Sequence, residues 1–258
     1  MQYLLAALTG ALVALAYPLV GAWPLIFVAW TPLMVAIEGA SPRRRFLLGW
    51  LAGIVATMGI QYWLAGSVVR LTGAPWWAAI LALASYSAFI GCQLGFFALA
   101  YGPLRRFSGR MAWIVTVPVA FALIEQLYPV VFPIHAGNAL WQAPVLMQSA
   151  EWIGVSGLTW LVLLSSCGLT FVIEEIGRGR TSDHFVPTAI AGLWVMLGMW
   201  GLVRMDQVWS APVQGSPTVA LVQPNVTVAE KQDRDPRVRQ EVYRRTVQMT
   251  RDVLAKRP

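Results

Sequence analysis

Few residues in this chain have side chains suited to chemistry, and a group of them lies in one long, mostly apolar segment. Residues 132–144 contain His135, Asn138 and Trp141 among apolar neighbours. Histidine exchanges protons near neutral pH, whereas asparagine and tryptophan donate hydrogen bonds. The sequence places no nucleophile or carboxylate beside His135. We therefore expect His135 to pack or to form hydrogen bonds, rather than to act as an acid or base.

Three isolated charges, Arg70, Glu125 and Glu151, lie near the ends of apolar runs. Charged side chains inside a membrane are costly, and those near its surface usually reach toward water. We expect all three to lie at one interface, within reach of water. Alternatively, they line a polar recess in which Arg70 binds a lipid phosphate through charge-assisted hydrogen bonds.

The two cysteines, Cys92 and Cys167, each lie inside an apolar run. A buried thiol among apolar neighbours stays protonated and unreactive. We expect two packing residues, with neither a disulfide nor a metal site, and no motif indicates a cofactor.

The composition is that of a membrane protein, with 57% hydrophobic and only 12% charged residues, against about 25% charged residues in soluble domains. A membrane-spanning helix needs about 20 apolar residues. Seven runs are candidates: 1–17, 23–38, 46–66, 76–101, 111–128, 150–173 and 186–204. Run 23–38 contains two prolines, so it is either a span or a tilted or re-entrant segment. Run 1–17 has no basic leader, which favours a retained helix over a signal peptide.

The arginines between these runs alternate from loop to loop and indicate the orientation. One set of loops holds eight: Arg43, Arg44, Arg45, Arg105, Arg106, Arg110, Arg178 and Arg180. The other set holds only Arg70. Because cytoplasmic loops are rich in basic residues, we expect a cytoplasmic N-terminus and a C-terminal tail outside the cytoplasm. The net charge of +7 does not indicate nucleic acid as a partner, because the arginines of the first part lie in these loops and the tail carries charges of both signs without interleaved aromatic residues.

We divide the chain into a helical bundle (residues 1–205), a linker (206–217) and the start of a water-soluble domain (218–258). Thr218–Gln223 is a short, β-branched apolar run, which predicts a buried strand. Asp235 followed by Pro236 predicts the start of an amphipathic helix. One strand and one helix cannot bury a core alone, so we expect a truncated α/β domain and a chain that is a fragment.

A series of short motifs, in order and over nearly the whole chain, resembles the N-terminal part of bacterial apolipoprotein N-acyltransferases. They are Tyr17-Pro18, Trp23-Pro24-Leu25, Pro32-Leu33, residues 39–46, Gly49-Trp50, residues 61–64, Phe132-Pro133, residues 148–157 and residues 219–225.

The resemblance implies a multi-pass protein of the bacterial inner membrane with a periplasmic nitrilase-like αββα domain. A Glu-Lys-Cys triad in that domain moves an acyl chain from a phospholipid to the N-terminal diacylglyceryl-cysteine of an apolipoprotein, through a cysteine thioester. The triad would lie beyond Pro258, so no catalytic residue is assigned here and the fragment is expected to be inactive alone. The expected partners are the phospholipid donor, the apolipoprotein acceptor and membrane lipids. Candidate lipid-contacting residues are Arg70, His135, Asn138, Trp141 and Glu151.

Two other functions remain open from the sequence. A small polytopic transporter or flippase would account for the bundle and for charges at its interface, but not for an α/β segment outside the cytoplasm. A non-catalytic membrane scaffold is the other.

Overall fold

A computed structural model describes residues 1–179, 184–211, 215 and 219–255, with the side chain of Arg110 excepted. Four parts of the sequence predictions therefore lie outside the described residues. They are Arg180, most of the linker after Ala211, Thr218 at the start of the predicted strand, and residues 256–258 at the end of the predicted soluble domain.

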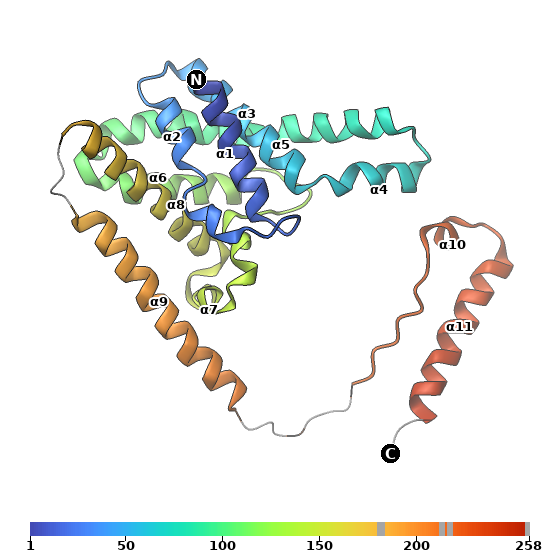
Figure 1. The fold of residues 1–258 in the computed structure, drawn as a ribbon. Helices are drawn as coiled ribbons and strands as arrows, with labels where there is room; N and C mark the ends of the chain where they lie inside the picture. Colours follow the sequence, from blue (N-terminus) through green and yellow to red (C-terminus); the bar gives the residue numbers. More distant parts are fainter. Residues whose placement is uncertain (180–183, 212–214, 216–218, 256–258) are drawn as a thin grey trace.

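The described chain is helical and contains no β-strand (Figure 1). Its elements are α1 (Gln2–Ala16), η1 (Trp23–Phe27), α2 (Thr31–Ile37), α3 (Pro42–Ile60), α4 (Trp63–Thr72), α5 (Trp76–Phe107), α6 (Gly109–Leu127), η2 (Ala136–Gln142), α7 (Pro144–Met147), α8 (Ala150–Gly177), α9 (Phe185–Trp209), α10 (Val228–Gln232) and α11 (Pro236–Ala255).

Three helices, α5, α8 and α9, are long and apolar enough to cross a membrane. The pair α3 and α4 makes a fourth candidate if the two are one span, bent by 62°. This agrees with the predicted helical membrane part. Seven spans are not established, because α1, residues 23–37 and residues 111–127 form shorter apolar helices.

Run 23–38 does not form one continuous α-helix. It consists of the short helix η1 and the seven-residue helix α2, each with a proline in its first turn. Proline is tolerated there but interrupts a helix interior, so Pro24 and Pro32 mark the two helix starts.

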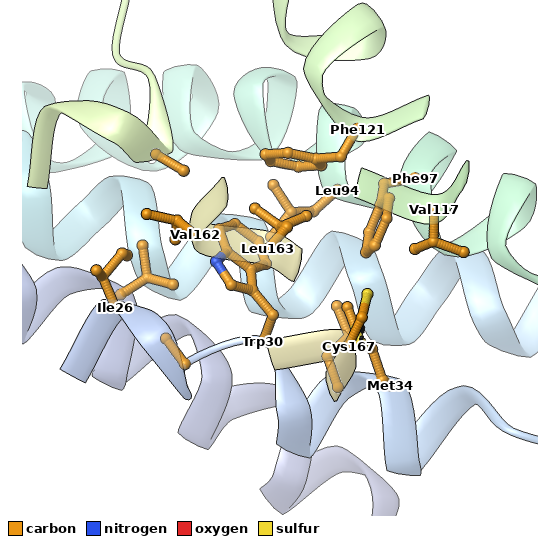
Figure 2. Packing of buried hydrophobic residues seen from close by; sticks show 14 of the residues in the cluster. Ile26, Trp30, Met34, Leu94, Phe97, Val117, Phe121, Val162, Leu163 and Cys167 are labelled. Carbon is orange, nitrogen blue, oxygen red and sulfur yellow. Dashed lines mark hydrogen bonds between the residues drawn. The ribbon is translucent and has the colours of Figure 1, made fainter. Parts of the chain in front are cut away.

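Helices α3 and α5 approach each other closely because glycines face each other across the contact. A Cβ atom added to Gly53 would lie 2.6 Å from Gly91 Cα. Small residues at helix contacts let backbones approach and gain dispersion energy in an apolar solvent. Beside this contact, Trp30 is buried, with its ring 4.8 Å from Phe121 and 6.4 Å from Phe97 (Figure 2).

At one end of the bundle, ion pairs join several helix ends. Arg105 near the end of α5 pairs with Glu38 after α2 and with Glu174 of α8. Arg178 pairs with Glu174 and Glu175. The C-terminal ends of α2, α5 and α8 therefore meet at the same end of the bundle, and the described arginines predicted for the cytoplasmic loops lie in or beside the helix turns at that end.

The tail agrees with the prediction in its long helix but not in its strand. Helix α11 begins at Pro236 as expected, and Asp235 Oδ1 accepts a hydrogen bond from Arg237 N at 2.9 Å. The strand predicted over 218–223 is not found in residues 219–223. A strand needs a neighbour to pair with, and none exists in the described chain. Val219 and Leu221 are accordingly exposed.

A short helix, α10, was not predicted. Thr227 and Glu230 form a capping box in which each side chain accepts from the other residue's backbone amide, at 2.7 and 3.2 Å. The Thr-x-x-Glu spacing was a signal available in the sequence.

Candidate functional site

An extensive buried polar cluster surrounds Glu125, near the C-terminal end of α6. Glu125 is only 6% exposed as a residue, and its side chain is 4% exposed. Its Oε1 accepts a hydrogen bond from Ala136 N at 2.8 Å, and its Oε2 accepts one from Thr159 Oγ1 at 2.7 Å. His135 Nδ1 lies 3.1 Å from the same Oε2. A buried carboxylate is stable only with such partners, and Glu125 has three.

These bonds hold the segment after α6 against the bundle. Gly137 N donates to Thr159 Oγ1 at 3.1 Å, and Tyr17 Oη donates to His135 O at 2.6 Å. Gly137 packs so closely that an added Cβ would lie 2.6 Å from Leu158 Cβ. The cluster therefore joins α1, α6 and α8 through the backbone of one loop.

The environment of His135 favours its charged form. The hydrogen bond with the Glu125 carboxylate raises the pKa of His135, burial opposes the rise, and attraction to the negative charge adds to it. Expecting Glu125 to reach water was wrong, because its side chain turns inward to these partners. The expectation that His135 forms hydrogen bonds is met.

A cavity of about 60 Å³ adjoins the cluster. One water needs about 10–15 Å³ on the same measure, so the cavity accommodates only small groups. Its wall includes Glu125, Gln61, Gln93 and Trp30 among apolar residues. The buried atoms Trp30 Nε1 and Gln61 Oε1 have no hydrogen-bond partner in the described chain. The cavity wall is therefore mostly apolar with a few polar side chains, and no cysteine is among the described residues that line it.

The other predicted site residues are dispersed. Asn138 and Trp141 lie on η2, directly after His135, and Trp141 is 44% exposed. Glu151 at the start of α8 accepts two hydrogen bonds from Arg204 of α9, at 2.7 and 2.8 Å. Arg70 lies on α4, which extends away from the rest of the bundle beside α5 (Figure 1).

Sequence reasoning missed two members of the cluster. The sequence indicates Glu125 as an interfacial charge or as part of a polar recess, but not as the partner of His135, and it gives no indication of Thr159. The available signal for Glu125 was its position ten residues before His135. The loop between the two residues returns to the same helix end. A single threonine inside the apolar helix α8 gives no such signal.

Neither cysteine is placed to act as an exposed nucleophile. Cys167 is fully buried and its Sγ lies 3.8 Å from Met34 Sδ. Cys92 is half-buried, and its Sγ donates to Ala88 O at 3.5 Å. No group of three metal-ligating side chains occurs among the residues that the structure describes.

Comparison with known proteins gives the family. Residues 9–168, from α1 to α8, match the model of the apolipoprotein N-acyltransferase N-terminal domain. The chain belongs to this family. The match includes Glu125, His135 and Thr159, so the buried cluster lies within the family's own domain.

Curated relatives agree with that assignment. An apolipoprotein N-acyltransferase of Geobacter metallireducens is 28% identical over 232 residues, which cover 87% of this chain and 43% of the relative. One from Rhizobium etli is 30% identical over 248 residues, covering 90% and 45% respectively. One from Bdellovibrio bacteriovorus is 27% identical over 233 residues, covering 88% and 42%. The chain therefore spans less than half the length of these relatives.

Proposed function

We propose that this chain is the membrane part of an apolipoprotein N-acyltransferase. The observation that carries the proposal is the family match over residues 9–168, which covers the bundle from α1 to α8. In the proposed reaction a catalytic thiolate attacks an acyl ester of a phospholipid and releases the lysophospholipid. The amine of a lipoprotein's N-terminal diacylglyceryl-cysteine then attacks the thioester, forms the amide and returns the thiol.

The bundle's part in this reaction is to hold the reacting domain at the membrane surface, where both lipid substrates lie. We propose that residues 1–258 do not transfer acyl groups alone. Burial of Cys167 and the position of Cys92 within α5 support this, because a nucleophile must reach the ester carbonyl. The proposed division remains bundle 1–205, linker 206–217 and start of the nitrilase-like domain 218–258.

The proposal also fixes an orientation in the bacterial inner membrane. Seven crossings, counting the shorter apolar helices, would place the N-terminus and the arginine-bearing loops in the cytoplasm and the tail in the periplasm; if residues 23–38 do not span, the N-terminus moves outside and the tail stays in the periplasm. The Glu125 cluster would then lie at the periplasmic end. There Arg70 and Trp141 would contact lipid headgroups, and Glu151, His135 and Asn138 would shape the surface between them.

A chimera tests the proposed function. Residues 1–211 are joined to the remaining part of the Geobacter metallireducens relative and expressed in a strain depleted of its own enzyme. We expect growth, and mass spectrometry should show lipoproteins with a third acyl chain. The control replaces residues 1–211 with an unrelated bundle of similar length. Triacylation by the control, or by residues 1–258 alone, would contradict the proposal.

A further inference from the structure

A groove borders the C-terminal end of α5. The next helix, α6, starts at that end of the bundle, and Glu125 lies near the other end of α6. The groove and the Glu125 cluster therefore lie at opposite ends of the bundle. The groove runs between the start of α3 and the last turns of α5. Its polar lining residues are Ser41, Arg45 and Arg106, and its apolar lining residues include Leu99, Pro103 and Phe107. Among the residues that the structure describes, no carboxylate is part of this lining.

Arg45 is the unusual member, because its charge is buried without a counter-charge. The residue is 8% exposed, and its Nε donates to Ile37 O at 3.1 Å. No carboxylate of the described chain forms an ion pair with Arg45, and nearby Glu38 pairs with Arg105 instead. A buried charge without a partner of opposite sign is unfavourable. The groove thus presents a guanidinium whose counter-charge is not supplied by the described chain.

The surroundings of Arg45 hold it in place. The guanidinium packs on Gly102 of α5, where an added Cβ would overlap Nη1. Ser41 precedes the first turn of α3 and makes no side-chain capping bond. Its hydroxyl and the exposed Arg106 therefore add donors to the same groove.

We propose that this groove binds the phosphate of an anionic phospholipid headgroup. Guanidinium groups bind phosphate through charge-assisted, often paired hydrogen bonds. The apolar wall distinguishes a lipid from free phosphate: Phe107 is 88% exposed at the end of a helix long enough to span a membrane. The phosphate contacts Arg45, Arg106 and Ser41, while the glycerol and first methylenes lie on Leu99, Pro103 and Phe107. This site does not depend on the proposed acyl transfer.

Native mass spectrometry of the full chain in a neutral detergent tests the proposal. The chain is mixed separately with phosphatidylglycerol, with zwitterionic phosphatidylcholine and with inorganic phosphate. We expect one phosphatidylglycerol to be retained in preference to the other two. Arg45→Gln and Arg106→Gln should each weaken that binding about tenfold. Gly102→Ala should weaken it similarly, because it displaces the guanidinium without removing its charge.

Arg43→Gln is the matched control. Arg43 is exposed in the same helical turn and is not part of the groove, yet its loss changes the net charge by the same amount. We expect less than a twofold effect from it. An equal effect of Arg43→Gln would overturn the site in favour of diffuse attraction. Equal binding of phosphatidylcholine, or inorganic phosphate bound as tightly as the lipid, would also overturn it. If circular dichroism shows that Arg45→Gln has lost helix, the binding of phosphatidylglycerol by Arg106→Gln decides whether the site exists, because Arg106 is exposed.

Discussion

His135 Nδ1 and Glu125 Oε2 lie 3.1 Å apart, across a loop that leaves α6 and returns to the same end of the bundle. The pair is shielded from water on both sides, since the side chains are 14% and 4% exposed. Electrostatic attraction is therefore less weakened by solvent here than at the protein surface.

Replacing Glu125 by glutamine should destabilise the bundle. Glutamine keeps the shape, but its amide group cannot accept from Ala136 N, His135 and Thr159 together. We expect a loss of about 1–3 kcal/mol in the free energy of unfolding, measured by denaturation in detergent. Glu151→Gln is the control, because Glu151 is half-exposed with a single partner, Arg204, and should cost about 1 kcal/mol or less. Equal costs would mean that the buried cluster has no special role.

The stability of the bundle should depend on pH through His135. The folded state raises the pKa of His135 above its ordinary value of 6.5. The imidazolium thus contributes stability that is fully present below pH 6.5 and is lost as pH rises through the raised pKa. Unfolding midpoints measured up to about pH 8.5 should fall more for the unchanged chain than for His135→Asn. Parallel curves for the two proteins would contradict this.

The close contact of α3 with α5 predicts a large effect from one methyl group. Gly53→Ala would place Cβ 2.6 Å from Gly91 Cα and 2.8 Å from Gly91 O. Because backbone atoms must then move apart, we expect a loss of about 1–3 kcal/mol. Gly192→Ala in α9 is the control, since an added Cβ there meets nothing within 4 Å. Thermal unfolding in detergent gives the unfolding midpoints of the two variants. An unchanged midpoint for Gly53→Ala would show that the two helices separate easily.

The proposed orientation can be measured by cysteine labelling. Cys92→Ala and Cys167→Ala remove the native thiols, and single cysteines replace Ser41 or Val219, both of which are exposed. A membrane-impermeant maleimide added to intact spheroplasts should label Val219→Cys at once. Ser41→Cys should react only after the membrane is permeabilised. The opposite pattern would reverse the orientation, and labelling of both from outside would place the two ends on one side.

The sequence by itself determined the features that depend on neighbouring residues or on solvent. Long apolar runs gave α5, α8 and α9, because a helix buried in lipid needs apolar side chains over its length. Asp235 and Pro236 gave the start of α11, since capping is local. The prolines of run 23–38 signalled its interruption.

Only the tertiary structure decided which polar groups meet. The sequence predicts hydrogen bonding for His135 and places Glu125 at the interface or in a polar recess, but it does not pair the two or bring in Thr159. Their meeting depends on how α6 and α8 pack, which is long-range information absent from residue spacing. The strand predicted over 218–223 is not found in residues 219–223 for the same reason. A strand forms when a neighbour satisfies its backbone hydrogen bonds, and no local pattern provides that neighbour.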